Sequence, residues 1–255
     1  MSLITNMDYR YQVGMGYISD AQTWNKFGYN TDIDSGSGEE VIASFGGPIN
    51  IMTSADTLDI FSSDANDTNS SGTGARSVRV TGIDENNEIQ EVDYNLNGVT
   101  KVTTAEQWLG INRVVVLTSG SSGTNEGTIT VEDTGGTVGT QAEIPIGASV
   151  TEQCIFHTPI DYTLLTDWLK LNALKVSGGG GSPRVTFRGY SFSRVTGTTY
   201  EILNIDIDTD VENTISLSPS QPFIIQGREV LYFTAETDVN NTSVSCRFSG
   251  ILKAV

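Results

Sequence analysis

Apolar and polar residues alternate along several separate stretches of this chain. In each stretch the apolar residues occupy every second position, and polar residues such as Ser, Thr and Arg lie between them. A period of two residues is typical of β-strands with one buried and one solvated face. The pattern therefore predicts an all-β fold, an antiparallel β-sandwich, and places four sets of side chains in its core: Val78 and Val80; Ile129 and Val131; Val185 and Phe187; Val244, Cys246 and Phe248.

Loop-forming segments rich in Gly, Asn, Asp and Ser separate these runs and predict turns or hairpin ends. They lie at residues 64–75, 84–88, 119–127, 133–140, 177–183 and 238–243. The segment at 177–183, SGGGGSP, resembles a linker but stands between two strand-like runs. We therefore expect it to be a hairpin tip and place no domain boundary there.

The segment 161–174, DYTLLTDWLKLNAL, is compatible with either a helix or a strand. Leu164, Trp168 and Leu171 fit one face of a helix, but the neighbouring apolar row ends at Asn172. A pattern of Trp, Leu, any residue, an apolar residue and Asn occurs at 108–112 and again at 168–172. This repetition favours a strand and suggests two similar halves.

The first 50 residues are polar and irregular, with short apolar runs such as 41–52. We expect residues 1–50 to form an arm that wraps a neighbouring chain or packs along the outside of the sandwich. Residues 51–255 would then form the β-sandwich, and the two boundary candidates lie near residues 50 and 145.

Composition and charge narrow the choice of partners. Hydrophobic residues make up 37% of the chain and charged residues only 18%, with a net charge of −17. Such an acidic surface repels phosphates and anionic lipids, so we expect no direct binding to nucleic acid or membranes. The N-terminus lacks the basic start and apolar run of an export signal, and no stretch approaches the roughly 20 apolar residues of a membrane helix.

The residues most often used in catalysis are scarce. Cys154 and Cys246 each alternate with apolar neighbours, which predicts buried free thiols rather than a disulfide. His157 is the sole histidine, on the strand face opposite Cys154 and Phe156, so we expect it at a surface or interface. A lone histidine supplies neither a metal site nor a nucleophile–base pair.

Two acidic runs could in principle bind calcium. Asp206, Asp208 and Asp210 would share one face of a strand, and residues 62–69 form an acidic loop. Neither run has the glycine and final acidic residue of an EF-hand loop, so a solvated surface is the better interpretation. With no phosphate-binding loop or nucleophile elbow in the sequence, we predict a non-enzyme with no catalytic residue, cofactor or metal site.

Two stretches are similar to known proteins. Residues 55–133 contain, in order, GTGAR, a G-x-D after an alternating strand, an LNG turn, and INR followed by SGSSGTNEGTI. The C-terminal part contains TEQCIFHTP, GSPRVTFRGYSF and REVLYFTAETDVNNTSVSCRFSGIL. Together these motifs cover about three quarters of the chain, and they resemble virion structural proteins of tailed bacteriophages, especially marine ones.

The resemblance implies a jelly-roll-like β-sandwich that is a non-enzymatic part of a phage virion. Head decoration or cement is slightly favoured over a tail location. It also implies a homo-oligomer, such as a trimer, that binds the major capsid protein or tail proteins. Two alternatives stay open: a carbohydrate-binding β-sandwich on a receptor-binding appendage, and a glycosidase or lyase for which the sequence names no residue.

Overall fold

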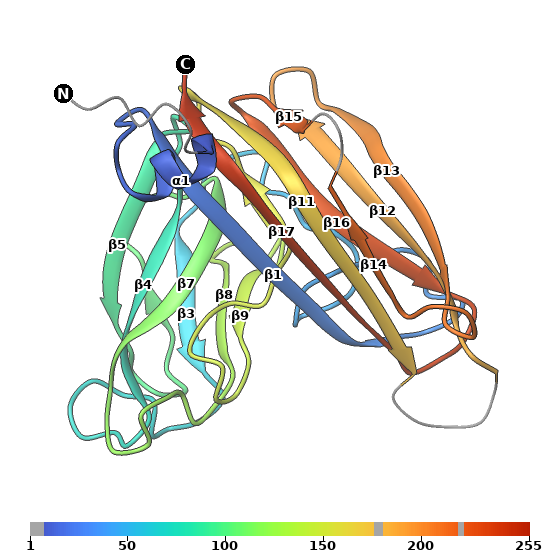
Figure 1. Ribbon diagram of the computed structural model, residues 1–255. Helices are drawn as coiled ribbons and strands as arrows, with labels where there is room; N and C mark the ends of the chain where they lie inside the picture. Colours follow the sequence, from blue (N-terminus) through green and yellow to red (C-terminus); the bar gives the residue numbers. More distant parts are fainter. Residues whose placement is uncertain (1–7, 176–180, 219–221) are drawn as a thin grey trace.

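In the computed structural model, residues 8–175, 181–218 and 222–255 are described. Within these residues the protein has seventeen β-strands and one short helix, α1 (Tyr9–Gly14). All strand pairs are antiparallel. The strands form two β-sandwiches that lie side by side (Figure 1). The predicted all-β, antiparallel, jelly-roll-like sandwich fold is confirmed.

The larger assembly, which we call the large sandwich, contains two five-stranded sheets. Its first sheet has the order β1 (Ala21–Ile33), β17 (Thr242–Ala254), β11 (Tyr162–Lys175) and β14 (Thr214–Leu217), with β15 (Phe223–Ile225) also paired to β11. Its second sheet has the order β10 (Ile155–His157), β16 (Glu229–Thr237), β12 (Arg184–Ser193) and β13 (Thr198–Asp208), with β2 (Glu40–Val41) also paired to β16.

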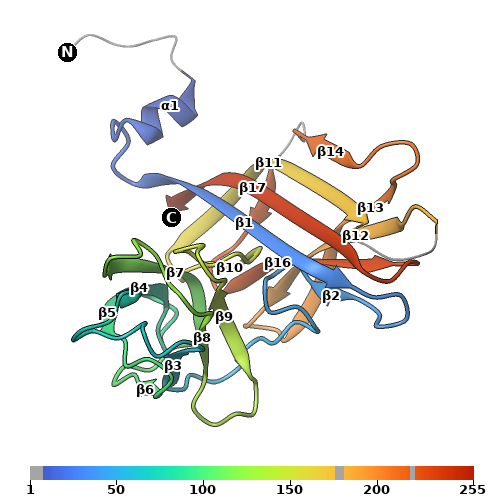
Figure 2. The same cartoon turned by 90° about the horizontal axis from the view of Figure 1, so that it is seen from below.

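The small sandwich is built from the middle of the chain. One sheet has the order β6 (Val102–Thr103), β3 (Leu58–Ser62), β8 (Ile129–Asp133) and β9 (Thr140–Ile144). The other has the order β5 (Ile89–Asn95), β4 (Ala75–Ile83) and β7 (Gly110–Ser119). The chain therefore begins the large sandwich, leaves it to build the small one, and returns to complete it (Figure 2).

Each sandwich has its own hydrophobic core, and the predicted core positions are confirmed. Val78, Val80, Ile129 and Val131 are buried in the small sandwich, together with Trp108. In the large sandwich the buried residues include Val185, Phe187, Val244, Cys246 and Phe248. Their polar strand neighbours, such as Arg247, face outward as the alternation predicts.

The ambiguous segment at 161–174 is a strand, β11, interrupted by a bulge between Thr166 and Trp168. Leu169, Leu171 and Ala173 alternate into the core after the bulge, whereas Leu164 does so before it. A bulge inserts one extra residue and shifts the inward positions by one. This shift puts Leu164 and Leu171, seven residues apart, on the same face of the strand, as two turns of a helix would, whereas Trp168 lies on the opposite face from Leu169 and Leu171.

The strands on either side of residues 177–183, β11 and β12, do not pair with each other. β11 belongs to the first sheet of the large sandwich and β12 to the second, so the chain crosses between sheets here. Residues 176–180 lie outside the described residues. The expectation of a hairpin tip is therefore corrected: the two flanking strands pair with other partners.

The expected irregular arm over residues 1–50 contains a 13-residue strand. β1 pairs with β17 from Ala21 to Ile33. Its inward positions carry Trp24, Lys26, Gly28 and Asn30, a mostly polar or small set that hides the strand from a hydrophobicity pattern. Residues 41–51, in contrast, do pack along the outside of the large sandwich, where Val41, Ala43 and Phe45 cover Val230 and Tyr232.

Candidate functional site

The N-terminal segment 8–17 stands at the start of β1, with α1 clear of the two sandwiches except where it meets the first sheet (Figure 2). Asp8 caps the helix by accepting a hydrogen bond from the Arg10 backbone N–H at 2.9 Å. The Arg10 guanidinium forms an ion pair with Asp167 and donates to the Ser249 hydroxyl at 3.0 Å. These contacts hold the segment against β11 and β17.

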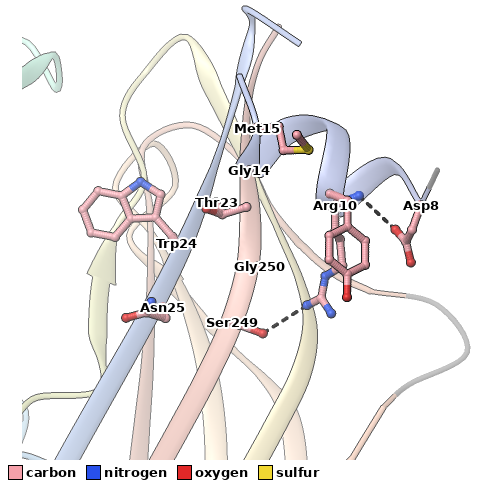
Figure 3. A pocket seen from close by; sticks show the side chains of 10 residues that line it. Asp8, Arg10, Gly14, Met15, Thr23, Trp24, Asn25, Ser249 and Gly250 are labelled. Atoms are coloured by element: carbon pink, nitrogen blue, oxygen red, sulfur yellow. Dashed lines mark hydrogen bonds between the residues drawn. The ribbon is translucent and has the colours of Figure 1, made fainter. Parts of the chain in front are cut away.

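A cavity of about 660 Å³ lies between this segment and the sheet. Figure 3 shows Arg10 and Met15 on the helix side and Thr23, Asn25 and Ser249 on the strand side. Trp24 points to the other side of β1, where Phe156 packs edge-on against its ring at 4.7 Å between centroids. Tyr11 and Trp24 also line the cavity, so it offers aromatic as well as polar side chains.

Large apolar and aromatic side chains are exposed close together on the N-terminal segment. The exposed fractions are 41% for Tyr9, 68% for Tyr11, 57% for Met15 and 58% for Tyr17. Tyr and Met are enriched at protein interfaces, and grouped exposed hydrophobic residues mark interaction sites. We call these four residues the aromatic cluster. Its chemistry suits the binding of another protein.

His157 is buried, which corrects the expectation of a surface or interface position. It is 4% exposed, at the junction between the two sandwiches. Burial, together with the nearby Arg194 and Lys26 cations, holds the pKa of the imidazole well below its ordinary value. Arg194 Nη2 lies 2.9 Å from His157 Nδ1, so Nδ1 accepts and the ring is neutral. His157 therefore has a structural role, as a hydrogen-bond acceptor for Arg194.

Cys154 and Cys246 are both buried free thiols, as predicted. The Cys154 thiol donates to the backbone carbonyl of Cys246 at 3.0 Å across the large sandwich. Burial raises the pKa of the Cys246 thiol well above its ordinary value. Thiolate chemistry is therefore suppressed at this position.

The three aspartates of the 204–210 run are engaged separately. Asp206 accepts from the Thr186 hydroxyl at 2.7 Å, Asp208 pairs with Arg184 at 3.2 Å, and Asp210 accepts from the Ser182 hydroxyl at 2.5 Å. Among the described residues, no group of three or more His, Cys, Asp or Glu side chains could hold a metal ion. Nor is any described helix long and apolar enough to cross a membrane.

The sandwiches meet along a polar seam that the sequence analysis missed. Lys26 of β1 donates to the backbone carbonyl of Asn112 on β7, and Arg113 of β7 donates to the carbonyl of Asn25 at 2.7 Å. Asn112 and His157 exchange two further bonds, of 2.9 and 2.6 Å. One feature of the sequence could have pointed to this seam. Lys26 stands two residues from both Trp24 and Gly28, so all three face inward once residues 21–33 are recognised as a strand.

Desolvation lowers the pKa of Lys26 to about 7, with the neighbouring Arg113 cation contributing. Burial also lowers the pKa of Arg194 to about 10. Buried cations that bond to backbone carbonyls fix the two sandwiches relative to one another.

Comparisons with known proteins add little to this geometry. The sequence matches no protein-family model and no curated protein. Among solved structures, particles derived from infectious bursal virus align over 92% of this chain and 78% of theirs, at 10% identity and a TM-score of 0.15. The structure of the Gt strain of infectious bursal disease virus aligns over 92% of this chain and 82% of its own, at 10% identity and a TM-score of 0.15. Superpositions at this level establish no common fold.

Proposed function

We propose that this chain is a non-enzymatic structural component of a phage virion, a capsid decoration or cement protein that assembles as a homo-oligomer on the particle. The proposal rests on the ordered motifs that resemble phage virion proteins. It is supported by an all-β scaffold in which a polar seam fixes two sandwiches together. Such a unit can be repeated on a particle, where symmetry multiplies the contribution of a modest contact.

The observation that carries the proposal is the aromatic cluster on the N-terminal segment. Tyr9, Tyr11, Met15 and Tyr17 are exposed on a segment that is tied to the first sheet by Arg10. In a protein with a net charge of −17, these side chains give a neutral or basic neighbour apolar area to bury. The cluster would contact the capsid protein or the next copy.

The test compares how the wild-type chain and two variants bind to particles that lack this protein. A Tyr9→Ser, Tyr11→Ser, Tyr17→Ser variant should fold normally but lose sedimentation with the particles, and light scattering should show fewer oligomers than for the wild-type chain. The matched control replaces three exposed residues elsewhere, Tyr200, Val211 and Ile224, with Ser. This control should bind and oligomerise like the wild-type chain.

A wild-type chain that is monomeric and binds neither heads nor tails would refute the proposal. Electron microscopy of decorated particles then separates the two locations: density over the capsid lattice supports decoration or cement, whereas density confined to the tail supports a tail-associated component.

A further inference from the structure

A second cavity, of about 490 Å³, opens where loops of both sandwiches meet. Thr53, Ser54, Glu85 and Asn87 line it from the small sandwich and its entry loop, and Arg194 and Arg228 line it from the large one. Ligand sites occur preferentially at such junctions, in cavities of about 300–1,000 Å³. This cavity lies apart from the aromatic cluster and plays no part in the proposed attachment.

Two arginines line this cavity, and neither forms an ion pair with a carboxylate of the described residues. The Arg194 backbone N–H donates to the Arg228 carbonyl at 3.0 Å, which brings the two residues together. Glu85 lines the same cavity, but among the described residues no ion pair joins either guanidinium to a carboxylate. In a chain with 31 acidic and 14 basic residues, a cavity lined by two arginines is an unusual concentration of positive charge and favours an anionic ligand.

The two guanidiniums differ in how they are held. Arg194 donates to the carbonyls of Met52 and Leu109 and to His157, and this fixes its position, while its buried Nε has no partner. The side chain of Arg228 is exposed and bonds to no other described side chain or carbonyl. Arg194 is therefore fixed in place with one Nη1 hydrogen left to donate, whereas Arg228 is free to turn toward a ligand and would supply most of the contact with an anion.

Two residues at the cavity have a left-handed backbone, which is ordinary for Asn87 in the turn between β4 and β5 but unusual for Arg228. Arg228 has φ of 67° and Asn87 has φ of 63°, a left-handed conformation that costs free energy for an arginine. Main-chain bonds maintain both: Arg228 N–H donates to Thr158 at 3.0 Å, and the Asn87 carbonyl accepts from Ile160 at 2.8 Å. A non-glycine residue held in this conformation, as Arg228 is, occurs more often at ligand sites than elsewhere.

Hydrogen-bond acceptors flank the arginines. The side-chain oxygen of Asn87 is buried without a partner, and the carboxylate of Glu85 and the hydroxyls of Thr53 and Ser54 line the same wall. A complementary ligand carries a carboxylate for the arginines and hydroxyl donors a few ångströms away for these oxygens. A simple acidic side chain has the carboxylate but no hydroxyls.

We infer that this cavity binds a carboxylated monosaccharide, such as the terminal sugar acid of a surface glycan. Arg228 and Arg194 would receive its carboxylate, and Asn87 would accept from a ring hydroxyl. The chain would then bind an acidic glycan in addition to its structural role.

The test is calorimetric titration of the full chain with sodium galacturonate and N-acetylneuraminate. We expect a Kd in roughly the millimolar range or tighter for at least one acid. Galactose, which has a CH₂OH group where galacturonate has its carboxylate, should not bind. Arg228→Gly and Asn87→Gly keep the left-handed backbone without strain and should weaken binding by about tenfold or more for Arg228 and several-fold for Asn87.

The matched control is Asn241→Gly, which has the same backbone conformation (φ of 57°) in the turn between β16 and β17. It should bind like the wild-type chain. Failure of both sugar acids to bind, or binding unaffected by Arg228→Gly, would overturn the inference. Equal binding of acetate or a Glu-containing dipeptide would show a general carboxylate site and overturn the saccharide assignment. None of these results depends on attachment to particles.

Discussion

At the scale of single residues, Lys26 is the clearest case of a polar group that the sequence pattern hides. The residue is 4% exposed, and its ammonium lies between the two sandwiches, where it donates to the carbonyl of Asn112. Because burial penalises the charged form, the pKa of Lys26 falls to about 7 in the folded protein. The folded and unfolded states then bind different numbers of protons above this pH.

This difference predicts a pH dependence of stability. Between about pH 7 and pH 10 the unfolded chain keeps the Lys26 proton and the folded protein has lost it, so stability rises with pH in this window. Relative to Lys26→Met, the free energy of unfolding of the wild-type protein should gain on the order of 4 kcal/mol across it. Urea denaturation at several pH values measures this. The exposed Lys170→Met variant should show no such trend.

Asp67 illustrates a buried carboxylate that organises loops. It is fully buried and accepts from the backbone N–H groups of Ala75, Glu126 and Gly127 and from the Ser62 hydroxyl, at 2.6 to 2.9 Å. The carboxylate thus ties the 62–75 loop to the 119–127 loop.

Asp67→Asn should destabilise the protein by about 2 kcal/mol or more, because an amide NH₂ cannot accept and leaves at least one buried donor unpaired. The loss is measured by urea denaturation. Asp210→Asn, on the exposed end of the 204–210 run, is the control. A stability loss of the same size in both variants would contradict the role of Asp67.

At the scale of elements, β7 and β10 approach closely at Gly110. A side-chain carbon added there would lie 2.3 Å from Nδ1 of His157, whose ring is held by Arg194. Gly110→Ala should therefore destabilise the protein by about 2 kcal/mol through overpacking. Thermal unfolding measures the effect. Gly181→Ala, where nothing lies within 4 Å, should leave stability unchanged.

At the scale of the whole molecule, the polar seam determines whether the two sandwiches unfold together. Each has a separate hydrophobic core, and buried hydrogen bonds through Asn112 link them. We expect one cooperative transition for the wild-type protein.

Asn112→Ala removes the reciprocal bonds with His157 and should split this transition into two in scanning calorimetry. Asn172→Ala loses bonds within the large sandwich alone and is the control. Two transitions already present in the wild-type protein would show that the seam does not couple the sandwiches.

The sequence by itself determined the fold class, the burial of both cysteines and the inward residues of the alternating strands. These depend on a local period of two, which any half-buried strand must follow. The strand at residues 21–33 was not predicted, because the inward positions of β1 carry Lys26 and Gly28 where an ordinary half-buried strand has apolar residues. The bulge in β11 left residues 161–174 open between strand and helix, because a local shift of register breaks the period of two.

Only the tertiary structure decided that two sandwiches exist and what lies between them. The burial of His157, the pairing of Lys26 and Arg113 across the seam, and the meeting of Arg194 with Arg228 all join residues distant in sequence. No spacing along the chain encodes these contacts, because they depend on how two separately formed cores pack against each other.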